Sequence, residues 1–243
     1  MSMGSELLGQ TVVIIGGSAG IGLETARRAR GEGANVILTG RNSERLESAA
    51  SEVGALSTAA FDATDFERLE RFFDELPTPI DHVLVTGPGP YYAPLAEFDI
   101  ETAPRHRGPS LAADTGGSKC RAQDALGRNP DLLERHRGRR AAAGFALISA
   151  LTAAKPAMAE NLALELAPVR VNVIAAGFVD TPLSASLLGD ELENRRNQLR
   201  ATLPIRRVVG PADVAALAVH IMTNTALTGA TYDVDGGQQF VAG

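Results

Sequence analysis

Hydrophobic and polar positions alternate in two periods along the first hundred residues. Short apolar runs rich in β-branched residues predict strands at 11–15, 35–39, 56–61 and 82–85. The segments between them have a helical pattern and predict helices from the turn at 16–22 to about Arg30, over 42–53, and from 64 to about 75. Thr64-Asp65-Phe66-Glu67 has the form of a capping box, so the third helix is expected to open there. This alternation is typical of βαβ units around a parallel sheet.

The same alternation returns after residue 144. Residues 151–167 are apolar, rich in alanine and helical in period, and 183–202 carries further helical pieces. Strands are expected at 170–175 and 231–234, and Gly210-Pro211 is a favourable start for a helix that runs to about Met222. The chain therefore predicts an α/β fold with a doubly wound parallel sheet, in a single domain spanning 1–243.

Between residues 103 and 140 the alternation fails. The large apolar residues there are four leucines, and no strand pattern is found. The chain has 21 arginines against two lysines, and eight of the arginines lie in this segment: Arg105, Arg107, Arg121, Arg128, Arg135, Arg137, Arg139 and Arg140. A structureless stretch of this length is unusual inside a compact domain.

Two interpretations of this anomalous segment, 103–140, stay open. In the first, a reading-frame shift in the gene or in its recorded sequence produced these residues. An out-of-frame reading of GC-rich DNA yields Arg, Ala, Gly and Pro, and the scarcity of lysine elsewhere indicates such DNA. In the second, the segment is a divergent surface insertion.

Composition and charge narrow the class of protein. The net charge of −6 argues against a nucleic-acid or membrane-surface partner. No apolar run reaches the roughly 20 residues of a membrane helix, and the first residues lack the pattern of a signal peptide. The single cysteine, Cys120, excludes an internal disulfide framework and a cysteine-rich zinc site, and no metal site is expected. A cytoplasmic protein is expected.

A glycine-rich turn directly follows the first strand and opens the first helix. Glycine permits a tight turn and lets the backbone approach a pyrophosphate, while the helix N-terminus supplies N–H groups and a partial positive charge. In this strand–turn–helix setting the turn predicts a Rossmann-type dinucleotide site, although an ordinary glycine-rich turn is the alternative. The expected cofactor contacts are Gly16, Ser18, Ala19, Gly20, Ile21 and Gly22.

The end of the second strand indicates which dinucleotide is bound. Gly40 offers no carboxylate to a ribose 2′-hydroxyl, and Arg41 can pair with a 2′-phosphate. NADP is therefore expected rather than NAD. A solvated surface arginine is the alternative interpretation of Arg41.

These segments resemble the short-chain dehydrogenase/reductase family over about residues 1–100 and 144–243. Gly16, Gly20 and Gly22 match its Thr-Gly-x-x-x-Gly-x-Gly pattern, with Ile15 in place of threonine. Residues 61–65, 172–181 and 228–237 are similar to its adenine-binding segment, its loop around the nicotinamide and its C-terminal signature. The resemblance implies further cofactor contacts from Asp62, Ala63, Gly87, Gly177, Val179 and Thr181.

The residues that carry this family's chemistry are mostly absent. The family uses a Tyr-x-x-x-Lys pair on one helix, an earlier serine and an upstream asparagine; the lysine binds the nicotinamide ribose and lowers the pKa of the tyrosine, which transfers a proton. Lys155 matches the lysine, but Leu151 stands at the tyrosine position. The serine position falls near 138–139, in the anomalous segment. Lys155 is therefore interpreted either as a catalytic ribose ligand or as a helix-surface lysine.

The resemblance implies an NADP-preferring oxidoreductase that acts on a small-molecule carbonyl or alcohol. The alternative is a catalytically impaired dinucleotide-binding protein on the same fold. Tyr91 and Tyr92 follow the fourth strand and are candidate replacement donors, although packing or pocket lining is the commoner role. The leucines in 183–202 indicate only an apolar substrate lining. The resemblance also allows for a homo-oligomer, whose interface helix would fall in the anomalous segment.

Overall fold

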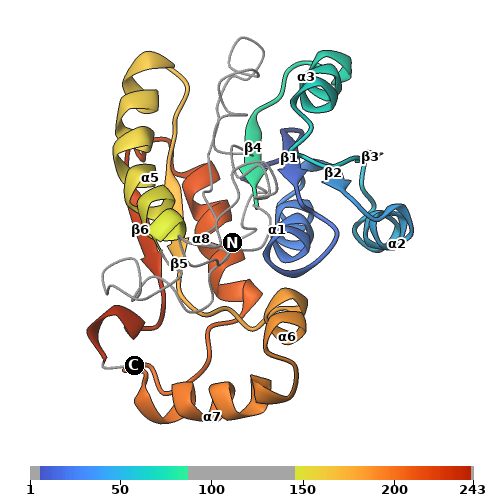
Figure 1. The fold of residues 1–243 in the computed structure, drawn as a ribbon. Coiled ribbons are helices and arrows are strands. Elements are labelled where there is room, and N and C mark those ends of the chain that lie inside the picture. Colours follow the sequence, from blue (N-terminus) through green and yellow to red (C-terminus); the bar gives the residue numbers. More distant parts are fainter. Residues whose placement is uncertain (1–5, 87–145, 242–243) are drawn as a thin grey trace, which may run out of the picture.

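The computed structural model describes residues 6–86 and 146–241 (Figure 1). The anomalous segment, Gly87, Tyr91 and Tyr92 lie outside these residues. The first part contains β1 (Thr11–Ile15), α1 (Gly20–Gly31), β2 (Asn35–Gly40), α2 (Ser43–Val53), β3 (Ser57–Ala60), α3 (Phe66–Glu75) and β4 (His82–Val85). The second part contains α5 (Ala146–Glu165), β5 (Val173–Ala176), α6 (Pro182–Leu188), α7 (Leu192–Thr202), α8 (Pro211–Thr223) and β6 (Thr231–Val234).

The strands form parallel ladders, as the alternation predicts. The first sheet has the order β3-β2-β1-β4, with Val13 opposite Ile37 on β2 and Val83 on β4. In the second sheet β5 pairs with β6, and Ile174 lies opposite Tyr232. Within the described residues, β4 pairs with β1 alone and β5 with β6 alone. The described strands therefore form two separate parallel sheets, one of four strands and one of two.

Helices cover both faces of these sheets. Alternate residues along a strand therefore pack into different hydrophobic clusters, one on each face. On β1, Val12 and Ile14 join the cluster that includes α1 and α8, whereas Val13 and Ile15 pack with the aromatic residues of α3. On β5, Val173 contacts the cluster of α5, and Ile174 faces the side of α8. Figure 1 shows α5 and α8 on either side of the two-stranded sheet. The predicted doubly wound arrangement is confirmed.

The two parts of the chain share one buried cluster. α1 packs against α8, and Ala26 of α1 and Ala218 of α8 are both fully buried. Ile14 of β1 and Ile174 of β5 belong to the same cluster. The segments that sequence analysis assigned to the cofactor are thereby held on one framework.

Several element boundaries differ from the sequence prediction. Helix α5 spans Ala146–Glu165 rather than 151–167, and α3 and β5 begin later than expected. The N-cap of α3 is Asp65 rather than Thr64: the Asp65 carboxylate accepts from the backbone N–H of Arg68 at 3.0 Å. The hydroxyl of Thr64 instead donates to the carboxylate of Asp62. The fifth described strand begins at Val173 and not at 170, because Val171 bonds to the loop before β6 through the Thr228 hydroxyl and the Gly229 N–H.

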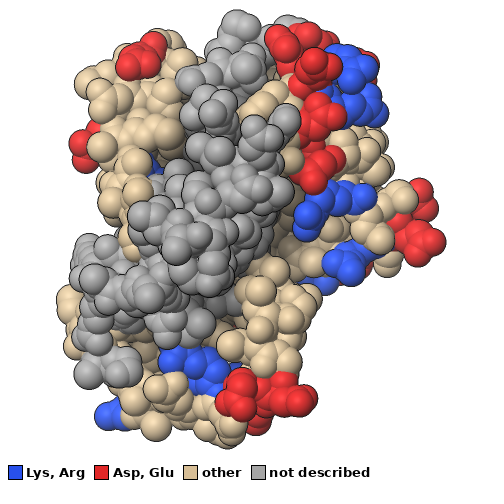
Figure 2. Space-filling model, viewed as in Figure 1, with Lys and Arg blue, Asp and Glu red and all other residues tan. Residues whose placement is uncertain are grey.

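The surface of the described residues carries both signs of charge. Figure 2 shows acidic and basic side chains next to one another over α3 and α2 and again at α7. Ion pairs such as Arg200–Glu193, at 2.9 Å, account for part of this pattern. In the same residues, no helix combines the length and apolar character needed to cross a bilayer. The cytoplasmic location stays a prediction.

The N-terminus of α8 depends on a carboxylate. Asp213 accepts the Gly210 N–H at 2.9 Å, and both its oxygens bind Arg207, at 2.6 and 2.7 Å. The Arg207 guanidinium holds the pKa of the Asp213 carboxyl below its usual value, with a smaller contribution from the Gly210 N–H. The charged form of Asp213 therefore stabilises the start of this helix.

Asp213→Asn is expected to lower the free energy of unfolding at neutral pH by about 1 kcal/mol, as the loss of a helix cap does. Because the folded-state pKa is depressed, this contribution is present above about pH 4 and is lost as the pH falls through the folded value. Urea unfolding at neutral pH and at about pH 3 measures both effects. The exposed Asp190→Asn serves as control. A deficit of the Asp213 variant that stays constant across this range would contradict the prediction.

Candidate functional site

The glycine turn is held tightly between β1, β2 and the end of β4. Gly16 has φ +88°, and the Gly16 N–H donates to the Thr39 carbonyl at 3.1 Å. The buried Thr86 hydroxyl donates to the carbonyls of Ile15 and Gly16, at 2.9 and 3.1 Å. A Cβ at Gly16 would lie 2.3 Å from the Thr86 hydroxyl oxygen, so only glycine fits this position.

Gly22 lets α1 approach the turn closely. A Cβ at Gly22 would lie 2.2 Å from the Gly16 carbonyl oxygen. The N-cap of α1 is Ala19, which makes no side-chain cap hydrogen bond, and the first turn of α1 carries no acidic residue. This helix N-terminus therefore offers N–H groups and a partial positive charge. Because no acidic side chain competes for them, they are available to bind an anion.

The end of β2 lies next to the same turn. Gly40 is buried, and a Cβ there would lie 3.1 Å from the Ser18 hydroxyl oxygen. Arg41, one residue on, is exposed. Gly40 and Arg41 thus lie beside the glycine turn, where a side chain at residue 40 would contact Ser18.

Asp62 follows β3 and is charged at neutral pH. One carboxylate oxygen accepts from both the backbone N–H and the hydroxyl of Thr64, each at 2.9 Å. The Thr64 N–H holds the pKa of the Asp62 carboxyl below its usual value, and the Thr64 hydroxyl and the positive charge of Arg41 add to the effect. These bonds orient the carboxylate and engage only one of its two oxygens with Thr64. Ala63, the neighbouring predicted contact, is half-buried.

The loop after β5, residues 177–181, is fastened along its backbone. Gly177 donates its N–H to the Val234 carbonyl at 3.1 Å, and Asp180 donates to the Val209 carbonyl at 2.9 Å. Val179 pairs with Val209 as a parallel β-bridge and is 1% exposed. The positions of the predicted contacts in this loop are therefore set by Val209, just before α8, and by β6.

A buried glutamine fixes the middle of this loop. The Gln238 side-chain oxygen accepts the Phe178 N–H at 2.9 Å, and Gln238 is 3% exposed. A Cβ at Gly177 would lie 2.7 Å from this oxygen, which explains the glycine. Sequence analysis missed Gln238, because no local pattern links it to a loop 60 residues earlier.

The loop and the glycine turn meet although they are far apart in the sequence. Thr181 is the N-cap of α6 and exchanges hydrogen bonds with Ser184 in a capping box. Its methyl group lies 3.4 Å from the place a Cβ on Gly20 would occupy. The structure thus brings together the glycine turn and the loop that the family resemblance assigns to the cofactor.

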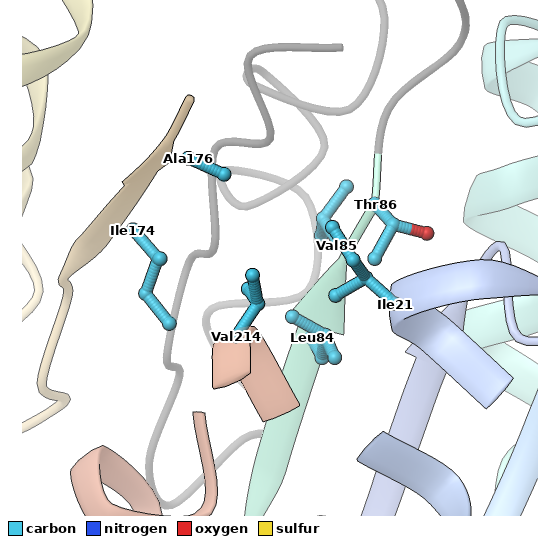
Figure 3. A pocket seen from close by; sticks show the side chains of 7 residues that line it. All are labelled: Ile21, Leu84, Val85, Thr86, Ile174, Ala176 and Val214. Carbon is cyan, nitrogen blue, oxygen red and sulfur yellow. The ribbon is translucent and has the colours of Figure 1, made fainter. Parts of the chain in front are cut away.

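An apolar pocket lies between β4 of the first sheet and β5 of the second (Figure 3). Side chains of β5 point toward those of β4 across it, and the Thr86 hydroxyl is turned away, toward the glycine turn. Its lining residues are Ile21, Leu84, Val85, Thr86, Ile174, Ala176 and Val214. Ile21, a predicted cofactor contact, therefore also borders this pocket.

Lys155 lies on α5 and is half-buried. Ala159, one helical turn later, is buried against β5, so Lys155 is directed to the same side of the helix as this contact. Leu151 occupies the position one turn before Lys155.

Two histidines lie in the described residues. His82 is buried and hydrogen-bonded to Gln10 at 2.7 Å, and His220 is exposed in the last turn of α8.

Family models match both ends of the chain. A model described as "short chain dehydrogenase" matches residues 10–99, and one described as "Enoyl-(Acyl carrier protein) reductase" matches residues 133–239. Residues 100–132, most of the anomalous segment, lie between the two matches. The matched ranges contain the glycine turn, Arg41, Lys155 and the loop at 177–181.

Individual proteins resemble the chain over nearly its whole length. The 3beta-hydroxysteroid dehydrogenase 1 of Eggerthella lenta is 30% identical over 257 residues, covering 99% of this chain and 98% of that protein. The structure of MalC Reductase/Diels-Alderase from Malbranchea aurantiaca has a TM-score of 0.83 and 25% identity, covering 96% and 97%. A crystal structure of BdcA in complex with NADPH has a TM-score of 0.79 and 26% identity, covering 96% and 95%.

Proposed function

Because the chain belongs to the short-chain dehydrogenase/reductase family, we propose that it is an NADP-preferring oxidoreductase. Its reaction moves hydride between the nicotinamide and a carbonyl or alcohol carbon of a small molecule. The observation that supports this proposal is the proximity of Thr181 to Gly20, which brings the loop after β5 next to the turn after β1. The NADPH-bound BdcA structure supports the cofactor, and the hydroxysteroid dehydrogenase supports the substrate class.

The residues present fit a dinucleotide phosphate. Glycine at residues 16 and 22 lets the turn and α1 pack closely together, and the N-terminus of α1 carries no side-chain cap. Arg41 would bind the 2′-phosphate and Asp62 the adenine, by charge and hydrogen bonding respectively. When bound, the nicotinamide supplies or accepts the hydride. Val179 and Thr181 would orient its carboxamide, and Lys155 would hold its ribose.

Arg41→Ala tests the preference for NADP. The substitution removes a charge-assisted contact to the 2′-phosphate, so the dissociation constant of NADPH is expected to rise about tenfold to a hundredfold. The dissociation constant of NADH is expected to stay within about twofold, because NADH carries no such phosphate. Titrations followed by nicotinamide fluorescence measure both constants.

Arg28→Ala is the matched control, since Arg28 is an exposed arginine of α1 away from the glycine turn. Equal loss of NADPH and NADH affinity on Arg41→Ala would contradict the 2′-phosphate contact. Absence of NADPH binding by the unaltered protein would contradict the proposed function itself.

The redox step is tested separately, by NADPH oxidation against a panel of aldehydes and ketones. Turnover of at least one carbonyl is expected.

A second candidate function is dinucleotide binding without the redox step, favoured by Leu151 at the position of the family's proton donor. MalC, which is named both a reductase and a Diels-Alderase, indicates that proteins of this fold also have activities other than hydride transfer. NADPH binding without turnover across a broad panel would favour this second function.

A further inference from the structure

Asp180 lies in the loop after β5, between the two residues proposed to contact the nicotinamide. The Arg196 guanidinium on α7 binds its carboxylate with two parallel hydrogen bonds, Nε to Oδ2 at 3.0 Å and Nη2 to Oδ1 at 2.8 Å. Paired bonds of this kind fix orientation as well as distance, because a planar fork meets a planar carboxylate. The pair therefore ties the loop to a helix outside the sheets.

This ion pair is better shielded from water than its neighbour on the same helix. The side chains of Arg196 and Asp180 are 29% and 31% exposed, against 50% and 57% for Arg200 and Glu193. Exposed pairs contribute little because solvent screens them, whereas partly buried bidentate pairs keep more of their attraction. The guanidinium of Arg196 also binds Glu193 at 3.2 Å, which holds the arginine side chain toward Asp180.

We propose that Arg196 is a positioning residue for the cofactor, acting through Asp180. The backbone anchors at Gly177 and Asp180 join the loop to β6 and Val209, and the Arg196 fork fixes its outer side. A shift of about 1 Å at a ligand-contacting loop costs much of the binding or rate. Helix α7 thereby controls where Val179 and Thr181 meet the nicotinamide. This inference rests on the proposed function.

The test is the NADPH affinity of Arg196→Gln beside Arg200→Gln. Arg196→Gln is expected to raise the dissociation constant of NADPH about tenfold, with a rise in KM for NADPH and a small change in kcat. Arg200→Gln, which removes an exposed ion pair of the same helix, is expected to stay within about twofold of the unaltered protein. Both variants are expected to melt within a few degrees of it, about the shift that a 1 kcal/mol change produces.

Two further variants keep the inference falsifiable if Arg196→Gln does not fold. Arg196→Lys keeps the charge but loses the fork, so an intermediate dissociation constant is expected. Asp180→Asn is expected to weaken NADPH binding as much as Arg196→Gln. Combining Asp180→Asn with Arg196→Gln is expected to add little, because both remove the same contact.

The outcomes separate this inference from the proposed function. Equal dissociation constants for the Arg196 and Arg200 variants, with binding by the unaltered protein intact, overturn the positioning role alone. The same holds if the losses from Asp180→Asn and Arg196→Gln add fully. Absence of NADPH binding by the unaltered protein overturns the proposed function and this inference together.

Discussion

Gly22→Ala is expected to abolish NADPH binding, raising its dissociation constant at least about a hundredfold. The added Cβ would lie 2.2 Å from the Gly16 carbonyl oxygen and 3.0 Å from the Gly16 carbonyl carbon. Both atoms belong to the backbone, and Gly16 is held by hydrogen bonds to Thr39 and Thr86. The start of α1 must therefore move away from the turn, and its N–H groups leave the position where a pyrophosphate would bind.

Gly31→Ala is the matched control for this substitution. Gly31 ends the same helix, and a Cβ there would meet no atom within 4 Å. Since alanine favours helix and restricts the unfolded chain, unchanged NADPH binding and slightly higher stability are expected. Fluorescence titration measures binding, and circular dichroism confirms that each variant is folded. A folded Gly22→Ala variant that binds NADPH within about twofold of the unaltered protein would overturn the close approach of α1 to the turn.

Leu151→Tyr is expected to raise carbonyl reduction by about a hundredfold to ten-thousandfold, the contribution of a positioned general acid. The substitution places a phenol one helical turn before Lys155, on the same face of α5. A protonated lysine beside the phenol lowers its pKa, because the positive charge favours the phenolate. The phenol then donates its proton to the carbonyl oxygen as hydride reaches the carbon.

Leu151→Phe separates the proton donor from the effect of an aromatic ring. Stopped assays of NADPH oxidation compare the two variants on the same carbonyls, and Lys155→Ala in the Leu151→Tyr background tests the role of the lysine. Loss of the gained activity in that double variant is expected. Equal rates for the tyrosine and phenylalanine variants would contradict the assignment of residue 151 as the missing donor position.

The fold was predictable because its signals are local. The apolar runs of β1 and β2 are continuous, as expected for strands buried on both faces, and the helices between them follow one period. The boundary error at the start of α3 arose where side chains compete with the regular pattern. Asp65 and Thr64 can each cap α3, and only the bond between Thr64 and Asp62 decides between them.

The candidate site was predictable only in part. The glycine turn is a contiguous pattern, so its position beside Arg41 could be inferred. Thr86, Gln238 and Arg196 were missed, because their bonds to the turn and the loop join residues 71, 60 and 16 positions apart. No periodicity in the chain encodes such pairs. The meeting of Gly20 and Thr181 likewise requires the folded framework.

Part of the family's catalytic site would lie in the anomalous segment. The family serine and interface helix would fall there, outside the described residues. The family models leave 100–132 unmatched, whereas the serine position near 138–139 lies within the second match. Both interpretations, a reading-frame shift and an insertion, remain hypotheses. Lys155 is the one family catalytic position that the chain retains, which is why Leu151→Tyr has so large an expected effect.

The packing of α1 against α8 also constrains the order in which the protein folds. The apolar side of α1 is covered by Val214, Ala218 and other residues that leave the ribosome about 200 positions later. At about 5–20 residues per second, synthesis takes roughly 10–40 s to reach them. During that interval the nascent N-terminal units keep an uncovered apolar surface. The core around β1 and α1 therefore cannot be complete until α8 emerges.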